Sequence, residues 1–248
     1  MEQNIKVEDL QVSYYGKTAI KDVSFSFEGG KLVGILGPNG AGKSTALKSI
    51  IGLIPTDKGT VRLSGQPVDD VRKEIAYVPQ RSNIDWDFPI EVKDAVLLGT
   101  FPRLGLFRRP GKKERELAAE CLEKVGMTEF ANRQIGELSG GQQQRVFMAR
   151  ALAQQAEFFF LDEPFVGIDV SSEEIIMDIL KELRSEGKMV LIVHHDLSKV
   201  ASYFDDIVLL NKKMIKSGPV SEVFTAENLS VTYERPIDAN FSLEAMVR

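Results

Sequence analysis

A glycine-rich stretch with one lysine is the first candidate for chemistry in this sequence. Residues 37–44 read GPNGAGKS, which satisfies the pattern G-x-x-x-x-G-K-[ST] of a phosphate-binding loop. Glycines let successive backbone N–H groups approach phosphate oxygens, and the helix that follows directs its positive end at the same place. Lys43 is expected to supply a point charge for the β- and γ-phosphates, and the Ser44 hydroxyl a ligand for Mg²⁺. The alternative is a glycine-rich turn that binds nothing.

Two carboxylates follow an apolar run further along the chain. Residues 158–161 (FFFL) predict a buried strand, and Asp162 and Glu163 come directly after it. Open α/β sheets place their sites at the carboxyl ends of strands, so these two side chains are candidates for the same nucleotide. We expect Asp162 to hold Mg²⁺ through its water shell and Glu163 to orient or deprotonate the attacking water. The alternative is an acidic loop after a buried strand.

A second glycine pair predicts a second anion site. In the sequence LSGGQQQR (residues 138–145), Ser139 has the position of a helix N-cap, and Gly140 and Gly141 expose the first amides of the helix. This stretch contains no lysine. The chain thus has two predicted phosphate-binding stretches, residues 37–44 and 138–145. A two-fold dimer explains both, because each glycine pair would then close over the nucleotide held by the other chain.

The elements around these motifs predict an α/β fold. Strand patterns lie at residues 7–12, 20–27, 31–36, 60–63, 75–78, 158–161, 189–193 and 207–210. Helical patterns lie at residues 42–51, 92–98, 114–125, 142–153 and 172–185. Continuous apolar strands indicate a parallel sheet covered on both faces, interrupted by a helical insert at about residues 82–155.

Composition narrows the class of protein. The chain has 248 residues, 43% of them hydrophobic, and a net charge of -5, which disfavours a non-specific DNA-binding protein. Cys121 is the only cysteine, so no intramolecular disulfide is expected and the thiol is interpreted as a buried filler of the 114–125 helix. No secretion signal is expected at the start, and the apolar runs are too short to cross a bilayer.

With these motifs in place, the chain resembles the ATP-binding subunit of an ABC transporter, whose signature is similar to LSGGQ at residues 138–142. The resemblance implies a P-loop NTPase (RecA-like) core with a parallel sheet, an antiparallel β portion and a helical subdomain specific to the family. It implies one cassette domain, divided into a nucleotide-binding core (1–81 and 156–226), a helical signature subdomain (82–155) and a C-terminal extension (227–248). The extension is expected to be a short packed segment or partly disordered.

The resemblance also implies roles for single residues. Tyr14 matches an aromatic that stacks on adenine, Gln80 a glutamine that senses Mg²⁺, and His195 a histidine that contacts the γ-phosphate. His194, beside it, is expected to be a buried core histidine. Asp169 matches an aspartate that communicates across the dimer. The predicted catalytic residues are Glu163, His195 and Gln80, and the predicted Mg²⁺ ligands are Ser44, Gln80 and Asp162. The predicted ATP contacts are Tyr14, Gly37, Pro38, Asn39, Gly40, Ala41, Gly42, Lys43, Ser44, Thr45, Ser139, Gly140, Gly141, Gln142 and Asp169.

Three segments narrow the resemblance to the manganese/zinc/iron importer branch. They are residues 80–90 (QRSNIDWDFPI), 162–169 (DEPFVGID) and 192–200 (IVHHDLSKV), which are similar to those of bacterial manganese importers. This implies an ATPase homodimer at the cytoplasmic face of the membrane, an integral permease and an extracellular metal-binding protein, with no nucleic acid partner. The permease is expected to dock near Gln80 and the acidic and aromatic set Asp85, Trp86, Asp87 and Phe88.

Other interpretations stay open. One is an importer ATPase for siderophores, haem or another small solute. Another, more remote, is a soluble ABC ATPase acting in DNA repair or on the ribosome, although the usual coiled coil or second ATPase domain is absent from the sequence. Trp86 and Phe88 could instead close the insert onto the core. The basic stretch 103–115 is a solvated loop or a contact for anionic lipid headgroups.

Overall fold

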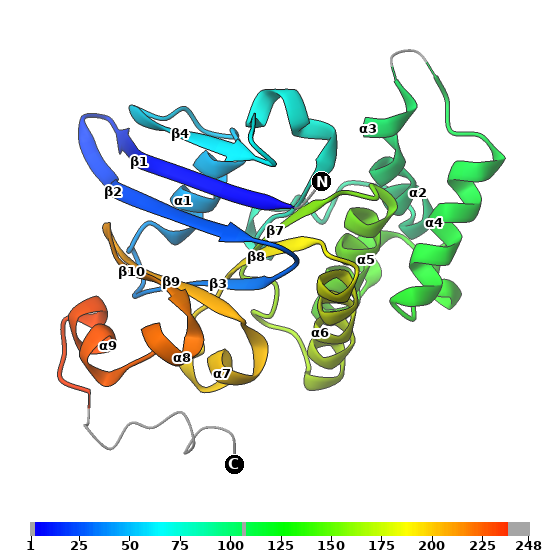
Figure 1. The fold of residues 1–248 in the computed structure, drawn as a ribbon. Coiled ribbons are helices and arrows are strands. Elements are labelled where there is room, and N and C mark those ends of the chain that lie inside the picture. Colours follow the sequence, from blue (N-terminus) through cyan, green and yellow to red (C-terminus); the bar gives the residue numbers. More distant parts are fainter. Residues whose placement is uncertain (1–2, 106–107, 238–248) are drawn as a thin grey trace. The chain divides into compact units, whose positions relative to one another are not determined.

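The computed structural model describes residues 3–105 and 108–237, which form two compact units. Unit 1 combines both ends of the chain (1–72 and 183–248), and unit 2 is the stretch between them (73–182). Figure 1 shows the elements coloured along the sequence. The subdomain boundaries at residues 82 and 155 stay a prediction, and the predicted extension beyond residue 237 lies outside the described residues.

Unit 1 is built on a mixed sheet. Its strands are β1 (Asn4–Tyr14), β2 (Lys17–Glu28), β3 (Leu32–Leu36), β4 (Lys58–Leu63), β5 (Gln66–Pro67), β8 (Met189–Val193), β9 (Asp206–Asn211) and β10 (Lys213–Pro219). They lie in the order β5-β4-β1-β2-β10-β9-β3-β8. Strand β3 pairs in parallel with β8 and β9, whereas β1 pairs antiparallel with β2 and β4, and β4 pairs antiparallel with β5. The predicted parallel sheet and antiparallel β portion are therefore both present.

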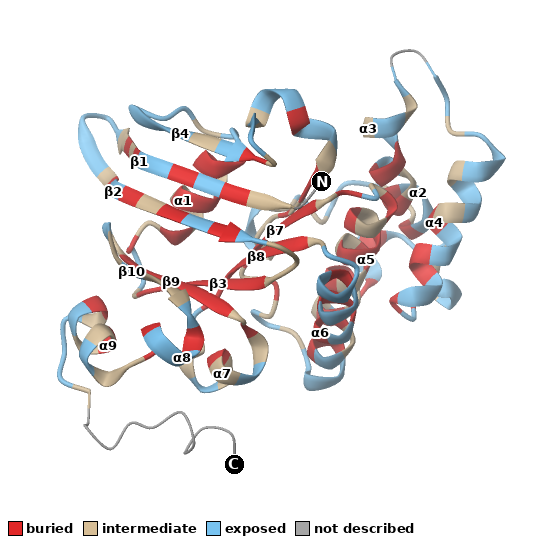
Figure 2. Ribbon diagram, viewed as in Figure 1, coloured by how far each residue is buried: buried red, intermediate tan, exposed pale blue. Residues whose placement is uncertain are grey.

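The two kinds of strand differ in burial, as Figure 2 shows. Every residue of β3 (LVGIL) and β8 (MVLIV) is buried, which is typical of parallel strands covered on both faces. Strand β1 alternates instead, with Ile5, Val7, Leu10 and Val12 buried between more exposed residues. The buried strand β3 therefore lies in the core of unit 1 and fixes the start of the phosphate loop that follows it.

The described helices of unit 1 are short, with 4 or 8 residues each. They are α1 (Lys43–Ile50), α7 (Val200–Tyr203), α8 (Val220–Val223) and α9 (Ala226–Tyr233), with 3-10 turns at Val68–Glu74 and Leu197–Lys199. Helix α9 covers the start of the predicted extension. It packs on β9 and β10, Leu229 is fully buried, and Asn211 Nδ2 donates to the carbonyl of Thr232 at 3.0 Å. The described part of the extension is therefore a packed segment.

Unit 2 pairs two parallel strands with a helical group. The strands are β6 (Ile75–Val78) and β7 (Phe158–Asp162). The helices are α2 (Val92–Leu97), α3 (Phe101–Leu104), α4 (Lys112–Lys124), α5 (Gly140–Ala153) and α6 (Val170–Ser185), with 3-10 turns at Arg81–Asn83, Leu98–Thr100, Thr128–Phe130 and Ile135–Glu137. Helices α2, α4 and α5 pack on one another, and α5 also packs on β6.

Cys121 lies in the core of this helical group. Its side chain is buried on α4, as expected, and burial raises the pKa of the thiol to about 11. The basic stretch is exposed at Arg103, Arg108, Arg109, Lys112 and Lys113. Two of these side chains form ion pairs, Arg103 with Glu74 at 3.0 Å and Lys112 with Glu116 at 3.5 Å.

Candidate functional site

The phosphate loop of unit 1 joins β3 to α1. Lys43 is the first residue of α1 and is buried, and its Nζ donates to the carbonyls of Gly37 at 2.9 Å and Pro38 at 3.0 Å. The ammonium is therefore held against the loop that the sequence assigns to phosphate. Ser44 and Thr45 follow in the first turn of the same helix, so their hydroxyls also belong to this end of α1.

The last glycine of the loop is required by its backbone and its surroundings. Gly42 is the N-cap of α1 and has a left-handed conformation (φ 92°), which side chains with a Cβ rarely adopt. A Cβ at this position would also clash with the side chain of Ile20 on β2. The glycine therefore lets the loop turn into α1 while packed directly on the neighbouring strand.

The other predicted residues of unit 1 lie at strand ends. Tyr14 ends β1 and its side chain is 43% exposed. His195 follows β8 and is exposed. His194 is buried, with its ring centroid 5.5 Å from Phe204, which confirms its interpretation as a core histidine. Both Tyr14 and His195 are accessible, as their predicted contacts with the nucleotide require.

Unit 2 brings Gln80 and Glu163 together. Strand β7 ends at Asp162, which is fully buried, and Glu163 follows it. Gln80 Nε2 donates to Glu163 Oε2 at 2.7 Å. Glu163 has φ 52°, a left-handed conformation that is uncommon for residues other than glycine and occurs often at functional sites. Two residues separated by 83 positions, predicted from different motifs, are thus hydrogen-bonded.

The buried carboxylate also acts on a neighbouring tyrosine. Tyr77 lies on β6, which pairs with β7. Burial raises the pKa of the Tyr77 hydroxyl, and the negative charge of Asp162 raises it further. Asp162 and the Tyr77 hydroxyl therefore interact electrostatically on neighbouring strands of unit 2.

The signature stretch starts α5 with a capping box. Ser139 Oγ accepts from the backbone N–H of Gln142 at 3.3 Å, and Gln142 Oε1 accepts from the N–H of Ser139 at 2.9 Å. A Cβ on Gly141 would clash with the side chains of Asp169 and Ser172. The sequence explains the cap, and the structure adds that this glycine makes room for Asp169.

Asp169 is fixed beside the start of α5. Its carboxylate accepts from Ser172 N at 2.8 Å and Ser172 Oγ at 2.9 Å, and these two hydrogen bonds lower the pKa of Asp169. The carboxylate is therefore ionised at neutral pH and oriented by its own helix. Unit 2 thus groups the signature residues with Asp169, and Gln80 with Glu163.

The predicted docking residues do not behave as one set. Phe88 is 59% exposed. Trp86 is half-buried, its Nε1 donates to the carbonyl of Arg81 at 2.9 Å, and its ring meets Phe147 of α5 edge-on with centroids 5.3 Å apart. Trp86 is therefore a packing residue of unit 2, and Phe88 presents its ring to the surface.

A cavity of about 330 Å³ lies beside Gln80 in unit 2. Its lining residues are Gln80, Arg81, Ser82, Ile84, Trp86, Val166 and Gly167. Sequence reasoning missed Arg81, which directly follows Gln80, and Gln143 of α5, to which Arg81 Nε donates at 3.0 Å. The only signal in the sequence was the position of an arginine next to the predicted sensor glutamine.

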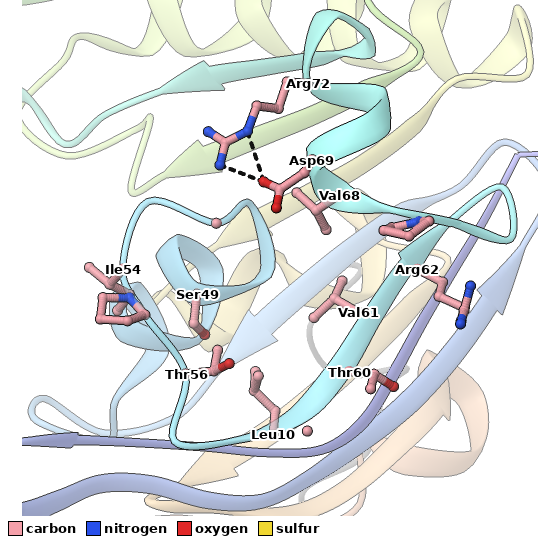
Figure 3. A pocket seen from close by; sticks show the side chains of 14 residues that line it. Leu10, Ser49, Ile54, Thr56, Thr60, Val61, Arg62, Val68, Asp69 and Arg72 are labelled. Carbon is pink, nitrogen blue, oxygen red and sulfur yellow. Dashed lines mark hydrogen bonds and ion pairs between the residues drawn. The ribbon is translucent and has the colours of Figure 1, made fainter.

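Unit 1 contains a second cavity of about 420 Å³, shown in Figure 3. It lies between the end of α1 and β4, and Arg72 and Asp69 form an ion pair at its rim with Nη2 and Oδ1 2.6 Å apart. Ser49 is the residue of α1 that lines it, one to two turns from Lys43. The cavity is therefore separate from the phosphate loop.

Residues 3–105 and 108–237 contain no group of three or more His, Cys, Asp or Glu side chains that could hold a metal ion. Over the same ranges, every helix is too short or too polar to cross a bilayer.

Comparisons with known proteins agree on one family. The family model described as ABC transporter matches residues 20–166. The manganese transport system ATP-binding protein MntB of Listeria innocua is 59% identical over 92% of this chain and 95% of its own. The zinc transport system ATP-binding protein TroB of Treponema pallidum is 51% identical over 92% of this chain and 86% of its own. The dimeric structure of MJ0796, a bacterial ABC transporter cassette, is 32% identical, with a TM-score of 0.77 over 87% of this chain and 98% of that one.

Proposed function

Because this chain belongs to the ABC transporter family as one of its ATP-binding cassette ATPases, we propose that it powers the import of manganese through a membrane permease. The observation that carries the choice of metal is the 59% identity to a manganese transport ATP-binding protein over nearly the full length of both chains. The expected fold and the resemblance to this branch are confirmed by the same comparisons. A zinc transport relative at 51% identity makes zinc the second candidate.

The proposed catalytic assembly is a homodimer with composite sites. The phosphate loop of one chain holds the phosphates, and the first turn of α5 from the second chain offers its amides to the same nucleotide. A helix that starts with glycines in each unit supports this arrangement, because one chain would then contribute to both nucleotides of a two-fold pair. The dimeric cassette MJ0796, similar over most of both chains, is a precedent for such a pair.

Each predicted residue has a proposed task in hydrolysis. Tyr14 stacks on adenine and Lys43 contacts the β- and γ-phosphates. Glu163 orients and deprotonates water, and its hydrogen bond from Gln80 Nε2 holds the carboxylate in one position between turnovers. His195 contacts the γ-phosphate. A fixed general base near the end of a buried strand is worth roughly 10²–10⁴-fold in rate.

Mg²⁺ fits the donor atoms of the predicted ligands. A hydroxyl at Ser44, an amide oxygen at Gln80 and a carboxylate at Asp162 are the hard oxygen ligands that this ion takes. Asp162 ends the buried strand β7 and directly precedes Glu163, so its carboxylate would be close to the proposed general base. When bound, the ion neutralises charge on the phosphate oxygens.

The permease is proposed to dock beside Gln80, at the cytoplasmic face of the membrane. The cavity lined by Gln80 and Ile84 would receive a segment of the permease, and exposed Phe88 would anchor it. Asp85 and Asp87, both exposed, would pair with basic residues of that segment. Trp86 also lines this cavity, and because its ring packs on Phe147 it would form part of the cavity wall, whereas Phe88 would be the exposed anchor.

Deletion of the gene, with measurement of cellular manganese, zinc and iron, tests the proposal. The expected result is a specific manganese deficit that is rescued by the wild-type gene and not by Glu163→Gln. A zinc deficit instead would transfer the assignment to zinc, and a defect in siderophore uptake would transfer it to the chelate branch. Unchanged uptake of all of these would contradict an import function.

A further inference from the structure

Two consecutive residues of unit 2 form hydrogen bonds with two different parts of the proposed machinery. Gln80 Nε2 donates to Glu163, the proposed general base, and Arg81 Nε donates to Gln143 Oε1, on the helix that starts with the signature. Gln80 has an extended backbone (φ -58°, ψ 138°), so the side chains of residues 80 and 81 point in different directions. The hydrogen bond to the proposed general base Glu163 and the hydrogen bond to α5 are therefore made by residues that are joined by one peptide bond.

The contact to α5 ends on a rigid acceptor. Gln143 is 3% exposed, and its Nε2 donates to the carbonyl of Ile135 at 3.2 Å, so both ends of the amide are bonded. A Cβ on Gly140, one turn earlier, would lie 3.3 Å from Arg81 Cζ and 3.0 Å from the carbonyl of Gly167. The guanidinium of Arg81 therefore lies directly on the first turn of α5.

Arg81 also contacts Trp86 in two ways. Its carbonyl accepts from Trp86 Nε1 at 2.9 Å, and its Cζ lies 5.7 Å from the centroid of the Trp86 ring. That ring packs on Phe147, four residues after Gln143 on the same helix. Both supports of Arg81 lead to α5, so a displacement of residue 81 is transmitted to this helix.

Helix stability does not explain a cation in this place. The N-terminus of a helix carries partial positive charge, and a guanidinium beside its first turn opposes that charge. The signature stretch has no lysine of its own, unlike the phosphate loop. An arginine here is unfavourable for α5 alone and favourable once an anion meets the same amides.

We propose that Arg81 is a positioning residue that couples the state of Gln80 and Glu163 to the placement of the signature amides. The inference rests on the proposed composite ATPase site. When the nucleotide alters the Gln80–Glu163 contact, the adjoining peptide moves, and the hydrogen bond to Gln143 shifts the first turn of α5 with it. Turnover of the dimer then depends on Arg81, whereas ATP binding to a single chain does not.

A double-mutant cycle on the full chain tests the coupling. The variants are Arg81→Ala, Gln143→Ala and the combination, with kcat, KM and the Hill coefficient for ATP as readouts. Each single change is expected to lower kcat about tenfold, the scale of one hydrogen bond to a charged donor, and to lower the Hill coefficient. ATP affinity of the monomer is expected to stay unchanged. The double variant is expected to be no slower than the slower single variant, because both changes remove one contact.

Two further variants separate geometry from charge. Arg81→Lys keeps the charge and cannot present an N–H at the Nε position, so it is expected to turn over as slowly as Arg81→Ala. Arg133→Ala, which removes another arginine–aromatic contact of unit 2, is the matched control and should hydrolyse like the wild type. Arg81→Gln keeps much of the side-chain volume and guards against a packing effect.

Several outcomes would overturn the inference. Losses that multiply in the double variant would show that the two residues act independently, and normal turnover in Arg81→Lys would reduce the role to charge. A lowered thermal unfolding midpoint in both Arg81→Ala and Arg81→Gln would make the residue structural. Absence of ATP hydrolysis in the wild-type dimer is a separate failure, because it would contradict the proposed function itself.

Discussion

The phosphate loop of unit 1 and the signature turn of unit 2 both place glycines before a helix, but for different reasons. In the loop, Gly42 is needed for its left-handed backbone and its closeness to β2. In the signature turn, Gly140 and Gly141 lie in α5 with ordinary helical geometry, and the missing side chains make room for neighbours. The glycine of the phosphate loop is required by the backbone conformation, whereas the glycines of the signature turn are required by the close approach of neighbouring groups.

Charge separates the two turns further. The loop has a buried lysine at the first position of its helix, whereas α5 has an uncharged serine cap. A site that contains a lysine can bind phosphate without help from a second chain. A site that offers only backbone amides binds one anion much more weakly. We therefore expect unit 1 to determine ATP affinity and the signature turn to act after ATP is bound.

The largest effect on the hydrolysis rate is expected from a substitution of the general base, which leaves both glycine turns intact. Glu163→Gln should slow hydrolysis about 10³-fold, because only the group that accepts the proton is lost. ATP should remain bound and hold two chains together, so size-exclusion chromatography with MgATP should show a stable dimer. Glu129→Gln, an exposed glutamate of the same unit, is the control. A monomer at saturating ATP would argue against composite sites.

Removal of the cation from the loop should give the next largest effect. Lys43→Ala should weaken ATP binding to the monomer about 100-fold, because a buried charged donor to phosphate is lost. Titration with a fluorescent ATP analogue measures this. Lys58→Ala, on exposed β4, should bind normally. Equal affinities of Lys43→Ala and the wild type would mean that the two turns do not differ in the proposed way.

A side chain on the signature turn should separate binding from turnover. Gly140→Asp places a carboxylate where Gly167 and Arg81 approach, and should slow hydrolysis about 30-fold through repulsion of phosphate. ATP affinity of the monomer should change less than about twofold. Gly140→Ala gives the steric part alone.

Mixed dimers sharpen the same test. A heterodimer of Gly140→Asp with Lys43→Ala should contain one intact composite site and show more hydrolysis than either homodimer. Loss of monomer ATP affinity in Gly140→Asp, equal to that of Lys43→Ala, would show that the signature turn serves its own chain.

The smallest expected effect concerns the cap of α5. Ser139→Ala removes the acceptor of the Gln142 N–H and should cost about 1 kcal/mol in unfolding free energy, with a loss of turnover of only a few fold. Ser139→Asn keeps an acceptor and should restore both. Thermal unfolding and steady-state hydrolysis measure the two quantities. A larger loss of turnover in Ser139→Ala than in Lys43→Ala would contradict the proposed ranking of the two turns.

The sequence was sufficient for the motifs and the apolar strands. Strands β6 and β8 have the predicted bounds, because short apolar runs between polar residues mark buried strands. Strand β10 was missed, since KMIKSGP combines lysines with glycine and proline and is mostly half-exposed. Local patterns identify an element by its own composition, and β10 is held by its partner β9 instead.

The contacts inside unit 2 could not be derived from the sequence. Arg81 and Gln143 are 62 positions apart, and a single polar contact at that separation leaves no periodic trace. The sequence predicts one docking role for the aromatic residues Trp86 and Phe88, and the structure separates them into a packing residue and a surface residue. The pairing of Gln80 with Glu163 was implied by neither motif alone.

The buried thiol of Cys121 makes the wild-type chain suitable for site-directed labelling. The raised pKa keeps the group protonated at neutral pH, and a neutral buried thiol reacts slowly with maleimides and methanethiosulfonates. A cysteine introduced at exposed Lys17 would therefore take up a spin label almost alone. In an ATP-held homodimer each chain would carry one label, and pulsed electron resonance would report a single distance between protomers without replacement of the native Cys121.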